Sequence, residues 1–274
     1  MKTALTIVVG VWLLTSVFGA QQAGKANLCE PSSRGQTVSV TYGRFKLTVT
    51  EPRNDTESCT FQVVAPAGEV LAHADYADYI PQPEYVDLDG DGTPELVVVA
   101  GSSGSGGYAD SYVFSQAPQL RLIKAVKEAC PVEVLNGPGG RALVTCDLDF
   151  ASFDGLCNAC SPRPAVYLRL EQGQLRDRSQ LFVRQYDEHI AGLRKQLSDR
   201  DVQAFLKSRN ANDGAYEGSN ARPSVLSIII DYVYSGREPQ GRQVVETMWP
   251  TWDRERVWND IVNTRSVGVL EQLQ

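Results

Sequence analysis

The stretch from Asp87 to Glu95, Asp-Leu-Asp-Gly-Asp-Gly-Thr-Pro-Glu, carries four carboxylates. Carboxylates that lie this close repel one another unless a cation neutralises them. Aspartates at alternate positions, with glycine at the turn, are how a short loop arranges oxygen ligands around Ca²⁺. The stretch therefore predicts a calcium site with a structural role. The alternative is a solvated turn that binds no metal.

The residues around this loop distinguish between two kinds of calcium site. An EF-hand shares the opening pattern, but it needs a bidentate Glu at position twelve and a helix on each side. Position twelve is Val98, and both flanks have the character of strands. The loop is therefore expected to close at its ninth residue, between two strands. The predicted ligands are four side chains and one backbone carbonyl: Asp87, Asp89, Asp91, Glu95 and Thr93.

The segment from Tyr85 to Val99, Tyr-Val-Asp-Leu-Asp-Gly-Asp-Gly-Thr-Pro-Glu-Leu-Val-Val-Val, resembles the FG-GAP or VCBS-type repeat. That resemblance implies a blade unit of an integrin-like β-propeller, with Ca²⁺ held between the first two strands of the blade. It places the ligands on the same five positions. The family usually continues with Gly-Ala-Pro, whereas this chain continues with Ala100-Gly101 and a loop rich in serine and glycine. Such repeats followed by helices resemble the layout of exported bacterial proteins.

A second, weaker unit begins at Val144, where Val-Thr-Cys-Asp-Leu-Asp echoes the start of the calcium loop. Asp154-Gly155 comes too late to complete the same loop, so this unit is expected to have lost its metal; a chance match is the alternative. The β-rich part offers about 140 residues, whereas a closed propeller needs four to eight blades. We therefore expect blade-like units in an open sheet or sandwich.

The periodicity of apolar residues divides the chain into four parts. Residues 1–20 have the charged start, apolar run and small residues of a signal peptide, with an uncleaved anchor as the alternative. Residues 21–36 are polar and are expected to form a flexible lead-in. Residues 37–178 alternate with the period of strands, and residues 179–274 change to helical spacing. Strands grouped before helices predict an α+β fold: an antiparallel β-rich part followed by a small helical bundle.

The six cysteines all follow the signal peptide, and an even number in an exported chain predicts disulfides. The favoured pairs are Cys29 with Cys59, Cys130 with Cys146, and Cys157 with Cys160. A thioredoxin-like role for Cys157 and Cys160 is disfavoured because a loop surrounds them. A zinc site formed by the last four cysteines is the other alternative. The protein is expected in the periplasm, on the cell surface or outside the cell, with no transmembrane segment after signal removal.

The sequence offers little for catalysis. There are two histidines, His73 and His189, and no nucleophile elbow precedes a helix. Glu84, Asp75 and Asp78 could supply a carboxylate pair, but nothing in the sequence positions one. The loop from 101 to 107 lacks the Lys-Ser/Thr of a phosphate-binding loop.

Two further features bear on partners. The tryptophans Trp249, Trp252 and Trp258 either pack the helices together or form a surface for a peptide or glycan. A formal net charge of −7 without a basic stripe argues against nucleic acid as a partner.

The sequence therefore predicts a non-enzymatic, exported, calcium-binding protein with a structural role or an unidentified protein or glycan partner. The alternative is a secreted hydrolase with a carboxylate site in the cleft between the β-rich and helical parts.

Overall fold

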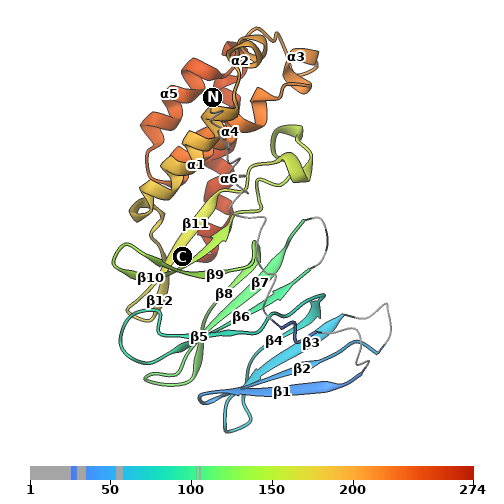
Figure 1. Cartoon of the computed structure of the whole chain (residues 1–274), viewed down its shortest axis with the longest axis vertical. Helices are drawn as coiled ribbons and strands as arrows, with labels where there is room; N and C mark the ends of the chain where they lie inside the picture. Colours follow the sequence, from blue (N-terminus) through green and yellow to red (C-terminus); the bar gives the residue numbers. More distant parts are fainter. Residues whose placement is uncertain (1–25, 30–34, 54–57, 103, 105) are drawn as a thin grey trace, which may run out of the picture.

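The structure, a computed structural model, describes residues 26–29, 35–53, 58–102, 104 and 106–274. The expected signal peptide, residues 1–20, lies outside these residues. The fold is α+β, as predicted: three four-stranded antiparallel sheets are followed by helices, and the described part forms no closed propeller. In Figure 1 the first sheet lies at one end of the molecule, the helices lie at the other, and the other two sheets lie between them.

Each sheet is built from four strands that are consecutive in the sequence. The first contains β1 (Thr37–Tyr42), β2 (Phe45–Thr50), β3 (Cys59–Val64) and β4 (Val70–Ala77). The second contains β5 (Glu84–Val86), β6 (Glu95–Gly101), β7 (Ala109–Ser115) and β8 (Arg121–Ala129). The third contains β9 (Glu133–Gly137), β10 (Gly140–Cys146), β11 (Ala165–Glu171) and β12 (Gln174–Asp177). Because neighbours along the chain are also neighbours in space, short turns suffice to connect most of these strands.

Strand β6 is buried along its whole length, which explains the uninterrupted apolar run from Leu96 to Ala100. Leu96, Val98 and Ala100 pack into the core that β6 shares with the first sheet. Val97 points the other way, into the main core of the molecule. A strand that is covered on both faces needs apolar residues at every position rather than at alternate ones.

The helical elements begin directly after β12. They are η3 (Ser179–Leu181), α1 (Val183–Gln196), α2 (Asp199–Leu206), α3 (Gly214–Glu217), α4 (Ala221–Tyr234), α5 (Glu238–Met248), η4 (Thr251–Asp253), α6 (Arg254–Val267) and α7 (Val269–Gln272). Helix α4 is apolar nearly all round, because α1, α2, α5, α6 and β11 surround it. Ser198 caps α2 by accepting a hydrogen bond from the Asp201 N–H at 3.1 Å.

The helices and the third sheet share one hydrophobic core. Val166 and Leu168 of β11 lie in the same buried cluster as Ile229 of α4 and Ile261 of α6. At the end of the chain, Gln272 of α7 exchanges hydrogen bonds with the backbone of Lys127 in β8, at 2.9 Å in both directions. No helix among the described residues is long and apolar enough to cross a membrane.

All six cysteines form disulfides, in the pairs that the sequence favours: Cys29–Cys59, Cys130–Cys146 and Cys157–Cys160. The zinc alternative is therefore wrong, because its four cysteines are bonded to one another.

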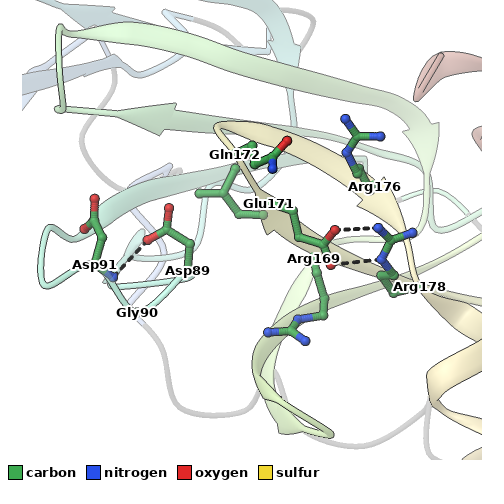
Figure 2. A pocket seen from close by; sticks show the side chains of 9 residues that line it. Asp89, Gly90, Asp91, Arg169, Glu171, Gln172, Arg176 and Arg178 are labelled. Carbon is green, nitrogen blue, oxygen red and sulfur yellow. Dashed lines mark hydrogen bonds and ion pairs between the residues drawn. The ribbon is translucent and has the colours of Figure 1, made fainter.

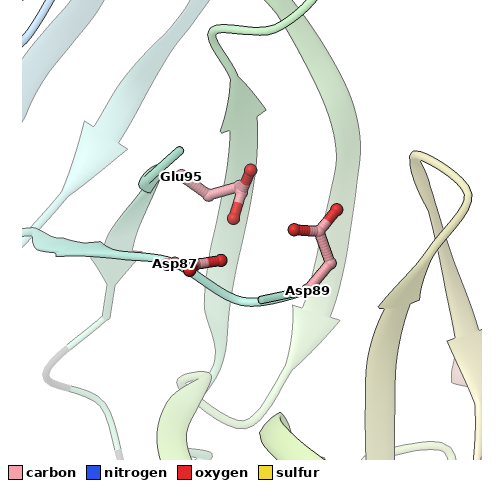
Figure 3. Close-up of side chains that lie close together, drawn as sticks. All are labelled: Asp87, Asp89 and Glu95. Carbon is pink, nitrogen blue, oxygen red and sulfur yellow. The ribbon is translucent and has the colours of Figure 1, made fainter. Parts of the chain in front are cut away.

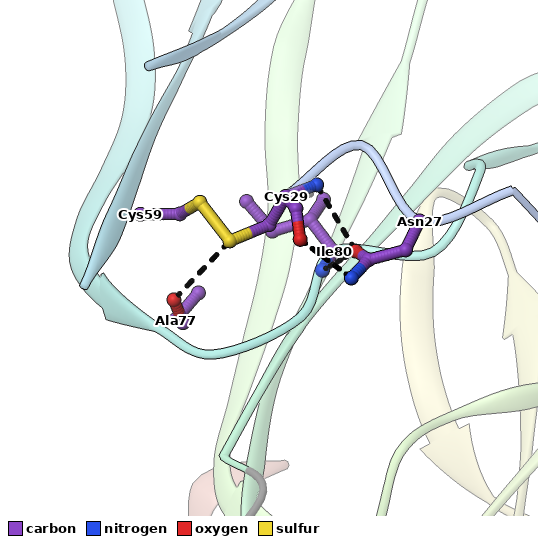
Figure 4. The surroundings of a disulfide bond; sticks show 5 residues. All are labelled: Asn27, Cys29, Cys59, Ala77 and Ile80. Carbon is purple, nitrogen blue, oxygen red and sulfur yellow. Dashed lines mark hydrogen bonds between the residues drawn. A yellow bond between two sulfur atoms is a disulfide. The ribbon is translucent and has the colours of Figure 1, made fainter. Parts of the chain in front are cut away.

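Residues 27–29, which belong to the expected flexible lead-in, are fastened beside the first sheet. The Asn27 side chain accepts hydrogen bonds from the N–H groups of Cys29 and Ile80, at 3.0 and 2.9 Å (Figure 4). Residues 27–29 are therefore held in place beside the disulfide to Cys59.

Candidate metal centre

The acidic loop connects β5 to β6, the first two strands of the second sheet (Figure 3). Val86, which ends β5, pairs with Glu95, which begins β6. The chain reverses direction between them with Gly90 and Gly92 at φ of 83° and 88°. Glycine adopts this left-handed conformation without steric cost, so both glycines are required by the turn.

The aspartates fold the loop onto its own backbone. Asp87 accepts hydrogen bonds from the N–H groups of Gly90 at 2.7 Å and Gly92 at 3.0 Å. Asp89 accepts one from the N–H of Asp91 at 3.1 Å. These bonds hold the carboxylates of Asp87 and Asp89 in fixed directions within the loop.

Glu95 differs from the aspartates because it is buried, with 2% of its surface exposed. Its Oε2 accepts a hydrogen bond from the Leu88 N–H at 2.8 Å. Burial is the main cause that raises the pKa of Glu95 to about 7; the hydrogen bond from Leu88 opposes this rise, and the charges of Asp89, Asp91 and Asp87 add to it. A buried carboxylate that faces other carboxylates is a group that a cation would stabilise strongly.

Three of the five predicted ligands lie together. One oxygen from each of Asp87, Asp89 and Glu95 lies within 4.8 Å of the other two (Figure 3). Ca²⁺ binds oxygen at about 2.3–2.6 Å, so two ligands of one ion can lie up to about 5 Å apart. The donor atoms are all carboxylate oxygens, which are hard ligands, and Asp89 is exposed to solvent. This donor set fits Ca²⁺.

The other two predicted ligands are not in this group. Asp91 is exposed, and its Oδ1 accepts a hydrogen bond from the Thr93 N–H at 2.6 Å. Ligation by Asp91 and by the Thr93 carbonyl stays a prediction. The sequence did not suggest Arg141 of β10, whose Nη1 donates to the Asp87 backbone carbonyl at 2.8 Å. This contact ties the third sheet to the loop, and its separation of 54 residues leaves no local signal in the sequence.

No protein-family model matches the chain, and the search of curated proteins finds no match. A solved structure that shows a partial likeness is the periplasmic lysozyme inhibitor of I-type lysozyme from Aeromonas hydrophila. It is 26% identical, with 34% of this chain and 89% of that chain covered and a TM-score of 0.25. The same inhibitor in complex with Meretrix lusoria lysozyme gives 26% identity, coverage of 34% and 86%, and a TM-score of 0.24. TM-scores this low carry no conclusion about the fold or the function of this chain.

In the weaker acidic unit near the end of β10, the carboxylates of Asp147 and Asp154 contact the helical part of the chain. Asp147 is fully buried and accepts hydrogen bonds from the Tyr234 hydroxyl at 2.6 Å and the Val269 N–H at 3.1 Å. Asp154 forms an ion pair with Arg222 of α4 at 2.8 Å. Among the described residues, the group of Asp87, Asp89 and Glu95 is the single cluster of three metal-ligating side chains.

The two histidines do not complete a catalytic triad within the described part of the chain. The Nδ1 of His189 lies 2.7 Å from Oδ2 of Asp231, but no hydroxyl or thiol among the described residues hydrogen-bonds to its other nitrogen. His73 is exposed and lies 3.9 Å from Asp75. The geometry around both histidines therefore offers no activated nucleophile.

The tryptophans pack the helical part. Trp249 is fully buried, and its Nε1 donates to Asp253 at 2.9 Å. Trp252 is partly exposed, but its Nε1 donates to the Ser208 carbonyl at 2.8 Å and its ring packs against Tyr216. These contacts favour the packing interpretation of the two residues over a binding surface.

Proposed function

We propose that this chain is an exported protein that Ca²⁺ stabilises, with a structural or partner-binding role in the periplasm, on the cell surface or outside the cell. The observation that carries the proposal is the buried Glu95 carboxylate, which faces Asp87 and Asp89 across a loop that is built for oxygen ligands. Three disulfides support an oxidising compartment, where such bonds persist.

The position of the loop supports an FG-GAP or VCBS-type unit. It joins the first two strands of a four-stranded antiparallel sheet, where the resemblance expects the metal. The unit belongs to an open arrangement of three such sheets, so the metal would stabilise one sheet rather than close a ring of blades.

The role proposed for the metal is to stabilise the β5–β6 hairpin. Leu88 in the loop is buried in the main core. Strand β6, which begins at Glu95, lies between this core and the core that it shares with the first sheet. An ion bound to Asp87, Asp89 and Glu95 would join the end of one strand to the start of the next. Extracellular modules of this kind bind Ca²⁺ with Kd of about 10⁻⁴–10⁻³ M, so millimolar calcium would occupy the site.

The test is thermal unfolding of the chain without its signal peptide, after chelation and then with 5 mM CaCl₂. A Kd near 0.5 mM predicts about 1.4 kcal/mol of stabilisation, which corresponds to a rise in Tm of about 3–6 °C for a protein of this size. Direct titration calorimetry with CaCl₂ supplies the Kd independently of unfolding.

Variants connect the effect to the loop. Glu95→Gln and the exposed Asp89→Asn should both abolish the rise in Tm, whereas Glu133→Gln, an exposed carboxylate of β9, should leave it unchanged. Because Asp89 is exposed, Asp89→Asn still tests the site if Glu95→Gln does not fold. Absence of any calcium-dependent change in the unsubstituted protein, or an equal rise in Asp89→Asn, would refute the proposal.

A further inference from the structure

The cavity between the acidic loop and the β11–β12 hairpin does not select a ligand by charge (Figure 2). Three carboxylates and three guanidinium groups line it: Asp89, Asp91, Glu171, Arg169, Arg176 and Arg178. Glu171 and Arg178 already form a bidentate ion pair with each other. Because these charges balance, electrostatic complementarity identifies no ligand for this cavity. The disulfide between Cys157 and Cys160, in contrast, offers a defined chemistry.

This disulfide differs from the other two in its exposure to solvent. Cys157 and Cys160 are both exposed. The cysteines of the other two disulfides are all buried: Cys29, Cys59, Cys130 and Cys146. A disulfide is opened by a thiolate that attacks one of its sulfurs directly. The exposed pair is therefore the one that a thiol in solution can reach while the protein stays folded.

The loop that carries this disulfide has contacts of its own. Cys157 and Cys160 are three residues apart, against 16 and 30 residues for the other pairs, and a shorter closed loop restricts the unfolded chain less. The Ser161 hydroxyl donates to the Cys157 carbonyl at 2.9 Å, and Arg163 donates to the Asn158 side chain at 3.3 Å. Because these bonds do not involve the sulfurs, the disulfide can open without unfolding the chain.

The two sulfurs are not equivalent. The backbone N–H of Cys160 is shared between Sγ of Cys157 at 3.1 Å and the Cys157 carbonyl at 2.9 Å. Among the described residues, none donates a hydrogen bond to Sγ of Cys160. An N–H that reaches a sulfur stabilises its thiolate, because a charged acceptor forms the stronger hydrogen bond. When the disulfide opens, Cys157 is therefore the sulfur that is favoured as a thiolate.

We propose that the Cys157–Cys160 disulfide is redox-active and exchanges with dithiols, with Cys157 as the first sulfur to leave, whereas the other two disulfides are structural. This chemistry does not require the long helix of a thioredoxin. It requires a sulfur that can be reached and a thiolate that is stabilised. Here both are supplied at η2 (Asn158–Cys160), a single helical turn.

The exchange proceeds in two steps. One thiol of the dithiol loses its proton and attacks Sγ of Cys160, which breaks the protein disulfide and releases Cys157 as a thiolate. The second thiol of the dithiol then loses its proton, attacks the sulfur of the first, and releases Cys160 from the mixed disulfide. The dithiol is oxidised by two electrons to a disulfide. The protein disulfide is reduced to two thiols, which take up the two protons.

The first experiment treats the folded, unsubstituted chain without its signal peptide with graded concentrations of dithiothreitol. Free thiols are trapped by alkylation at intervals and mapped by mass spectrometry, while circular dichroism monitors the fold. Cys157 and Cys160 should become alkylated at least about tenfold faster than the four buried cysteines, which serve as internal controls. Oxidised glutathione should then restore the bond, since exchange runs in both directions.

Reduction of all three disulfides at the same rate would overturn the proposal. Opening of Cys157–Cys160 only when the protein unfolds, or a pair that stays reduced in oxidised glutathione, would overturn it as well. Because this experiment uses the unsubstituted protein, it decides the proposal even where a cysteine variant does not fold.

The second experiment tests the asymmetry between the two sulfurs. Cys160→Ser leaves Cys157 as a thiol and keeps the backbone N–H of residue 160, whereas Cys157→Ser leaves Cys160. At neutral pH the Cys157 thiol should react with 5,5′-dithiobis(2-nitrobenzoate) about tenfold faster than the Cys160 thiol, because more of it is thiolate. The two rates should approach each other at alkaline pH, where both thiols are ionised. Equal rates at neutral pH, or a faster Cys160, would overturn the assignment of Cys157.

Discussion

The Nε of Arg222 in α4 donates to Oδ2 of Asp154 at 2.8 Å, and both side chains are only 6% exposed. This ion pair joins the segment after β10 to the helical part. Arg256 donates to the other oxygen of Asp154 at 2.6 Å, and the Tyr216 hydroxyl lies 2.9 Å from Oδ2. Asp154 itself has φ of 55°, a left-handed conformation that Asp and Asn tolerate better than most residues.

The Asp154–Arg222 pair provides the first prediction. Asp154→Asn retains a residue that tolerates the left-handed backbone but leaves a buried guanidinium without its charge partner. Such a loss typically costs about 3–5 kcal/mol. Urea unfolding should show this decrease relative to Asp199→Asn, an exposed carboxylate at the start of α2. A decrease below about 1 kcal/mol would mean that solvent compensates for the lost charge of Asp154.

The loop provides the second prediction, which concerns Asp91. Because Asp87, Asp89 and Glu95 lie together and Asp91 does not, Asp89→Asn should weaken calcium binding by tenfold or more, and Asp91→Asn by less. Calorimetric titration with CaCl₂ measures both Kd values. Equal losses in the two variants would favour the five-ligand set that the FG-GAP resemblance implies.

The disulfides provide the third prediction. Cys29–Cys59 spans 30 residues and Cys157–Cys160 spans three. Because a longer closed loop restricts the unfolded chain more, replacing both cysteines of the first pair by alanine should cost about 3–4 kcal/mol, against about 2 kcal/mol for the second. Denaturant unfolding of the two double variants tests the order. The reverse order would show that the exposed Cys157–Cys160 loop contributes through native contacts instead.

The fourth prediction concerns pH and the His189–Asp231 pair. The hydrogen bond with Asp231 raises the pKa of His189 above its usual value, against the effect of burial. A histidine whose pKa is raised by folding stabilises the protein fully below about pH 6.5, and this contribution is lost as pH rises through the folded-state pKa. Burial also raises the pKa of Asp231, which gives a pH dependence of the same sign.

Urea unfolding at pH 5.5 and 8.5 tests this sign. The unsubstituted protein should exceed His189→Gln in stability by more at pH 5.5 than at pH 8.5. Because the His189 side chain is 58% exposed, the difference should stay below about 1 kcal/mol after screening by solvent. A larger advantage at pH 8.5 would contradict the assigned direction.

The local features of this fold could be predicted from its sequence. The alternating strands, the change of period after β12 and the cysteine pairs all depend on residues that are near one another or carry strong individual preferences. The acidic loop belongs to the same class, because its predicted ligands fall within nine residues. Spacing alone suffices to describe such a site.

The contacts between distant segments could not be predicted in the same way. Asp147 and Tyr234 are separated by 87 residues, and Asp154 and Arg222 by 68. Asp147 and Asp154 had suggested a degenerate metal unit, whereas their oxygens bind groups from the helices. The hydrogen bond from Arg141 of the third sheet to the Asp87 carbonyl also depends on how the second and third sheets meet, which no local pattern encodes.

The complete burial of β6 has a consequence for how the second sheet folds. A strand with one polar face resists sliding by one residue, because the slip would expose its apolar side chains. Both faces of β6 are apolar, so Leu96 and Val97 could exchange cores without reaching water. The register in which β6 pairs with its neighbours must therefore be determined by the residues at the ends of the strand. Glu95, the charged residue at the start of the strand, is the feature that makes a slipped pairing costly, since it would lose its hydrogen bond from Leu88.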